Sequence, residues 1–100
     1  MTFDEQVRVA LDALPPDIAE RLENVAVVVE DENPEDPDLL GLFQEEPWLP
    51  AKVTVYRRPL EEEFGDAPDE LRREIRITVL HELAHYFGLD EERLEELGYA

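Results

Sequence analysis

The chain contains no cysteine and few basic residues, and both shortages exclude classes of protein. Without cysteine, neither a disulfide framework nor a thiolate metal site can form. Only 9 Lys and Arg residues stand against 27 Asp and Glu residues, which gives a net charge of −18. So large a negative charge would repel phosphate groups, and we therefore expect no nucleic-acid partner and no binding to anionic membranes.

Long apolar runs are also missing. No segment approaches the run of about 20 apolar residues that a membrane-spanning helix needs, and the N-terminus is polar rather than a signal region. The expected location is therefore the cytoplasm. The chain has 100 residues, of which 43% are hydrophobic, and this suits one globular domain. We expect residues 1–100 to form that single domain.

Histidine is scarce too, and the two histidines lie in one short segment. His81 and His85 are four residues apart, so on a helix their imidazoles share one face and can bind one Zn²⁺. Glu82 projects about 100° further round, where a general base for a zinc-activated water would lie. Gly88 can end the helix with a positive φ. Glu91, three residues later, offers a third ligand.

The surroundings of Glu82 support a functional role for it. From Ile77 to Leu89 it is the only side chain with a formal charge. A carboxylate in such an apolar helix needs a partner or a function. The structural alternative is a hydrogen-bonded glutamate between two packed histidines, and the motif spacing favours the metal site over it.

Hydrophobic periodicity predicts an α+β fold with about four helices and a small sheet. Residues 25–30 are almost continuously β-branched, which indicates a central strand, and residues 40–44 suit a short strand. The segment Lys52–Arg57 alternates with period two and has basic neighbours, which is typical of an edge strand. Helical spacing and caps predict helices near residues 3–13, 16–22, 68–87 and 91–97.

Three connecting segments carry further expectations. The acidic residues 31–38 lack the glycine and the spacing of an EF-hand loop, so a solvated loop is expected. Residues 45–50 are predicted to form a surface connection with Trp48 filling the core. Asp66 is expected to cap the long helix.

The motif segment resembles a known family. His81-Glu82-x-x-His85-x-x-Gly88-x-x-Glu91, continuing to Tyr99, is similar to the minimal zincin-like family of small bacterial zinc metallopeptidases. The likeness extends back to about residue 39. It implies a reduced zincin fold, with a small sheet over the active-site helix. It also implies zinc bound by His81, His85 and the acidic residue at position 91, and a peptide substrate that adds to a sheet edge, for which Lys52–Arg57 is the candidate strand.

The chain departs from larger relatives in two ways. Metzincins place a third histidine where this chain has Glu91, and they add a methionine turn, whereas the only methionine here is Met1. Other acids near the motif remain candidates for the third ligand. Asp90 is the next candidate, although it suits the cap of the last helix. Glu92 would point about 100° away from Glu91, and Glu95 would suit thermolysin-type enzymes, which have a longer connection.

These observations leave three functional hypotheses. The first is an active zinc peptidase, with Glu82 as general base and a peptide or protein substrate. The second is a metal-binding or regulatory module without turnover. The third, a metal-dependent ribonuclease, is disfavoured by the −18 charge and by the glutamate that follows the first histidine. A deformylase-type site would need a cysteine ligand, which the chain lacks.

Overall fold

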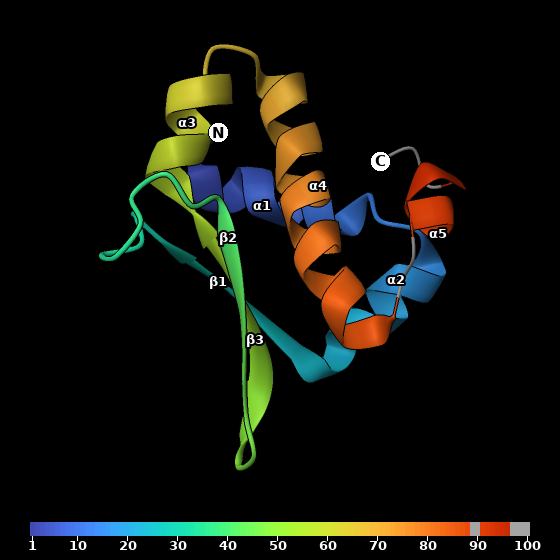
Figure 1. Cartoon of the computed structure of the whole chain (residues 1–100). Helices are drawn as coiled ribbons and strands as arrows, with labels where there is room; N and C mark the ends of the chain where they lie inside the picture. The colour runs from blue at the N-terminus through green and yellow to red at the C-terminus, as the bar shows by residue number, and fades with distance from the viewer. Residues whose placement is uncertain (89–90, 97–100) are drawn as a thin grey trace.

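The computed structural model describes residues 1–88 and 91–96, without the side chains of His85, Tyr86, Phe87 and Glu91. It confirms the predicted α+β class (Figure 1). The helices are α1 (Phe3–Asp12), α2 (Pro16–Arg21), the short 3₁₀ helix η1 (Leu22–Asn24), α3 (Arg57–Phe64), α4 (Pro68–Phe87) and α5 (Glu91–Glu96). The strands are β1 (Val25–Glu30), β2 (Gly41–Glu46) and β3 (Leu49–Tyr56). No helix in this described part of the chain has the length and apolar character to cross a lipid bilayer.

The three strands form one mixed sheet in the order β1-β3-β2. β1 runs parallel to β3, and β2 runs antiparallel to it. Helix α4 packs against β2 and β3, with α1 beside it, so both helices lie on the same side of the sheet (Figure 1). The long helix therefore lies against the small sheet, as the family resemblance implied.

The expected roles of two strands were wrong. β3, predicted as an edge strand, is the central strand, and Val53, Thr54 and Val55 are all fully buried. β1, predicted as central, lies at an edge, and its valines from 27 to 29 are only half-buried. The basic residues misled the prediction for β3 because Lys52 lies near its exposed end and Arg57 already belongs to α3.

Helix α3 was not predicted at all. Arg57 was predicted to end a strand, but it begins α3, and Pro59 lies in the first turn of that helix, where helix N–H groups have no partner within the helix. Arg57 reaches Glu61 one turn later, at 2.7 Å, and Asp31 at 2.9 Å. Leu60, which is fully buried, anchors this helix in the main core.

Two local expectations were also wrong. Trp48 was expected to fill the core but is 80% exposed, because it lies in the tight turn between β2 and β3. Figure 1 shows this hairpin projecting beyond the rest of the molecule. Asp66 does not cap α4, which starts after Ala67 without a side-chain cap, with Pro68 in its first turn. By contrast, α1 has a side-chain cap, Thr2, which accepts a hydrogen bond from the backbone N–H of Glu5.

Candidate metal centre

Helix α4 fixes where the histidine segment can point. Ile75, Val79 and Leu83 lie four residues apart and are fully buried in the main core against the sheet and α1. Leu80, also fully buried, packs on a second apolar cluster. These contacts use most of the helix circumference, and His81 is left exposed on the remaining face. The burial of its neighbours thus holds His81 towards solvent.

The helix continues without interruption through His85 to Phe87. Residues 81 and 85 are therefore one turn apart on one side of α4, as the motif requires. The side chains of His85 and Glu91 lie outside those that the structure describes, and Asp90 lies outside the described residues altogether. Among the described side chains, no three His, Asp or Glu residues converge as a metal-binding group.

Glu82 is half-buried, and its carboxylate contacts the sheet. Its Oε2 atom accepts a hydrogen bond of 3.2 Å from the backbone N–H of Phe43 in β2. Phe43 lies 39 positions earlier in the chain, so folding alone brings the pair together. The carboxylate that sequence analysis marked as needing a partner has one in the edge strand.

Gly41 allows β2 to come this close to α4. A Cβ atom at Gly41 would lie 2.5 Å from Cγ2 of Thr78 and 3.6 Å from Cγ of Glu82. The first separation is well below van der Waals contact, so any larger residue would require the Thr78 side chain, the strand or the helix to move. The glycine was visible in the sequence as an interruption of a strand, which is a known mark of close backbone approach.

A cavity opens beside these residues. It has a volume of about 370 Å³, and its lining includes Gly41, Thr78, His81 and Glu82. The acidic loop before β2 closes one side through Asp36 and Asp38. His81 and Glu82 therefore face one space that is large enough for a few atoms of a ligand.

Asn33 makes three of the hydrogen bonds that order the acidic loop. The carboxamide oxygen of Asn33 accepts hydrogen bonds from the backbone N–H groups of Glu35 and Asp36, and its nitrogen donates to the hydroxyl of Tyr56. The exposed residues of this segment agree with the predicted solvated loop. Asn33 thereby ties the wall of the cavity to the end of β3.

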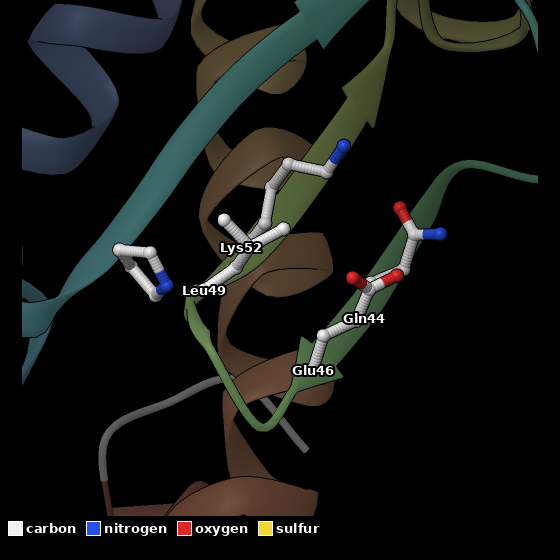
Figure 2. Close-up of a pocket in the computed structure, with 5 residues that line it drawn as sticks. Gln44, Glu46, Leu49 and Lys52 are labelled. Atoms are coloured by element: carbon white, nitrogen blue, oxygen red, sulfur yellow. The ribbon is translucent and has the colours of Figure 1, made fainter.

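A second hollow lies on the β2–β3 hairpin. Figure 2 shows its lining, which includes Gln44, Glu46, Leu49 and Lys52. It is smaller, about 110 Å³, and neither His81 nor Glu82 contributes to its lining. The hollow beside α4 is therefore the candidate site.

Helix α4 ends at a glycine in the left-handed conformation. Gly88 has φ of 66°, the left-handed conformation predicted for it, and its N–H donates to the carbonyl of Ala84. Helix α5 begins at Glu91, three residues later. Leu94 of α5 is buried beside Leu80, and this contact attaches α5 to α4.

The sequence was compared with models of known protein families. A family model described as zincin-like metallopeptidase matches residues 22–99. The chain belongs to this zincin-like family. The match covers all three strands, α4 and α5, and it begins well before the residues that carried the resemblance in sequence analysis.

Residues 1–21 precede the region shared with the zincin-like family. They form α1 and α2, and α1 adds Phe3, Val7 and Ala10 to the main core against α4. A search of curated proteins found no match to the chain.

Proposed function

We propose that this zincin-like protein is a zinc-dependent peptidase in which Glu82 is the general base. The observation that carries the proposal is the position of Glu82. Its carboxylate lies at the open edge of a strand, in the same cavity as the exposed His81. A base, an imidazole and a peptide-binding edge within one space suit peptide hydrolysis.

The proposed zinc ligands are His81, His85 and Glu91, which would leave a position open for water and substrate. Nitrogen and carboxylate donors of this kind are those that zinc prefers in catalytic sites, and the exposure of His81 leaves its ring accessible to a metal ion. When bound, zinc would lower the pKa of a coordinated water towards 7 and polarise the substrate carbonyl.

Glu82 then has two tasks in the proposed reaction. Its carboxylate accepts the proton of the attacking water, and the same group returns this proton to the leaving amine. Its carboxylate is half-buried in the cavity that Gly41 and Thr78 also line, so it can reach a water or a leaving group bound there.

The substrate edge in this proposal is β2 rather than β3. A peptide can extend a sheet only at an open edge, and β3 is paired on both sides. In the described part of the chain no strand pairs with the outer side of β2, and the Phe43 amide on that side already lies against Glu82. A peptide bound along β2 would therefore bring a backbone carbonyl next to the base.

The Glu82→Gln variant tests this function. We expect it to retain zinc but to hydrolyse peptides at least about 10²-fold more slowly, because the amide keeps the shape and cannot accept a proton. Activity is measured by mass spectrometry on a peptide library, and bound zinc by elemental analysis. Glu70→Gln is the matched control, since Glu70 is exposed near the start of the same helix.

Two outcomes would contradict the proposal. Near wild-type hydrolysis by Glu82→Gln would make Glu82 a structural residue. Zinc binding without hydrolysis in the wild-type protein would instead support the metal-binding module. In that case the fold would hold a metal without acting on peptides.

A further inference from the structure

The Phe43 amide lies on the open side of β2. The N–H of Tyr56 donates to the carbonyl of Leu40 at 3.0 Å, so Leu40 faces β3. Along an antiparallel strand, alternate residues bond to the neighbouring strand, and those between them point away from it. With Gly41 paired to Val55 and Phe43 to Val53, the N–H groups of Gly41 and Phe43 therefore face outwards.

An outward N–H group on an edge strand is the donor that an added strand would use. At Phe43 this donor is already bonded to Oε2 of Glu82. A carbonyl of a bound peptide and the carboxylate of Glu82 are both acceptors for the same hydrogen. Good geometry for one acceptor excludes good geometry for the other.

We propose that Glu82 caps the substrate-binding edge and that a bound peptide displaces it. In the free protein, the Phe43 amide holds the carboxylate. When a peptide pairs with β2, its carbonyl takes over the Phe43 N–H, and Glu82 is released to accept a proton. Phe43 is thus a positioning residue that acts through its backbone. This inference rests on the proposed function, because it assumes that a peptide binds along β2.

The cap has a direct consequence for affinity. Each peptide that binds must break the hydrogen bond between Glu82 and Phe43. The Glu82 carboxylate therefore competes with the peptide carbonyl for the Phe43 N–H. Removing the carboxylate should tighten peptide binding by roughly three- to tenfold, since a net hydrogen bond at a half-exposed site is worth about that factor. The gain should depend on the N–H of residue 43.

Proline and alanine at position 43 provide a matched pair. Phe43→Ala removes the side chain and keeps the N–H, whereas Phe43→Pro removes both. Proline is tolerated in an edge strand where its missing N–H would point away from the sheet, as it does here. Because both variants lose the aromatic ring, their difference isolates the backbone donor.

The experiment is a double-mutant cycle on peptide binding. The probe is a hexapeptide, acetylated and amidated, selected from a random library on zinc-loaded Glu82→Gln protein. Its dissociation constant is measured for Phe43→Ala and Phe43→Pro, each with and without Glu82→Ala. We expect Glu82→Ala to tighten binding roughly three- to tenfold with alanine at position 43 and to have no effect with proline. The charge change is the same in both backgrounds, so electrostatic effects cancel.

A second measurement covers the case in which Phe43→Pro fails to fold. In isotopically labelled wild-type protein, peptide binding should shift both the Phe43 amide resonance and the side-chain carboxyl resonance of Glu82. An unchanged Glu82 resonance during binding would overturn the proposal. Equal gains from Glu82→Ala in both backgrounds, or no peptide bound at millimolar concentration, would overturn it as well.

These readouts separate this inference from the proposed function. If the cycle shows the expected gain but no peptide is hydrolysed, the cap is real and the peptidase function is wrong. If peptides are hydrolysed but Glu82→Ala brings no gain in affinity, the function stands and the cap is wrong.

Discussion

Two apolar clusters support α4, and they differ in what they hold in place. The main cluster joins the sheet, α1, α3 and α4, with Val53, Val79 and Leu83 fully buried at its centre. The small cluster has four buried residues: Leu14, Ile18, Leu80 and Leu94. It joins the chain around α2 to α4 and α5. Helix α4 therefore packs against a large apolar cluster on one side and a small apolar cluster on another.

The difference in size matters because the two clusters position different residues of the proposed site. The main cluster sets the rotation of α4 and its distance from β2, and so it sets the contact of Glu82 with Phe43. The small cluster, through Leu94, holds the helix that begins with Glu91. We infer that the base is attached to the rigid part of the molecule, while the proposed third ligand depends on a few contacts.

Replacing one leucine in each cluster tests this comparison. Leu83→Ala should lower the free energy of unfolding by about 2–5 kcal/mol, because it leaves a cavity at the centre of the main core. Leu94→Ala should cost less, since Leu94 belongs to a cluster of only four buried residues and is slightly more exposed than Leu83. Urea denaturation measures both.

Zinc titration gives the second half of the same test. Leu94→Ala should weaken zinc binding at a concentration of urea that leaves the far-ultraviolet circular dichroism unchanged. A fall in stability as large as that of Leu83→Ala would show that the two clusters unfold as one unit, and the comparison would fail.

The next largest effect is expected from replacing the proposed third zinc ligand. Glu91→Ala should weaken zinc binding by about tenfold to a hundredfold, because a lost carboxylate removes both a ligand and a negative charge near the metal. Asp90→Ala and Glu95→Ala are the comparisons, and both should have smaller effects. Isothermal titration at fixed pH measures the affinities. Equal losses for all three would mean that the histidines and water alone hold the metal.

Some elements could be predicted from the sequence because their signals are local. Helix α4 has the predicted bounds, since Pro68 begins it, acidic residues follow in its first turn, and Gly88 ends it. Each of these signals acts within a few residues. The family resemblance was equally local, because it depended on the spacing of the motif that α4 carries.

Strand order could not be predicted in the same way. A valine-rich strand is expected to be buried, yet Val27 and Val29 of β1 are only partly buried against the main core. Composition indicates a strand but does not identify the neighbouring strands. The order of β1 and β3 was therefore interchanged in the prediction.

The partner of Glu82 could not be predicted either. The direction of the Phe43 N–H depends on the register between β2 and β3, which a sequence does not state. Gly41 was the only visible sign that a helix approaches the strand here. A contact between a side chain and a backbone group far away in the sequence can be identified only once the fold is known.

The smallest expected effect concerns the ion pair that joins α2 to α5. Arg93 contacts Asp17 at 2.6 Å on the surface. The hydrogen bond from Arg93 is the main cause that lowers the pKa of Asp17 below its ordinary value in the folded protein. A carboxyl with a lowered pKa stabilises the fold above its unfolded pKa, and this contribution disappears as the pH falls through the folded pKa.

Asp17→Asn should therefore lower stability slightly at pH 7 and leave it unchanged once the pH is below the folded pKa. The effect is small because both side chains are exposed to solvent, which screens their attraction. Urea denaturation of metal-free protein at the two pH values measures it, with Glu20→Gln on the same helix as control. If Asp17→Asn were as damaging as Leu94→Ala at pH 7, the ion pair rather than the apolar cluster would be what holds α5.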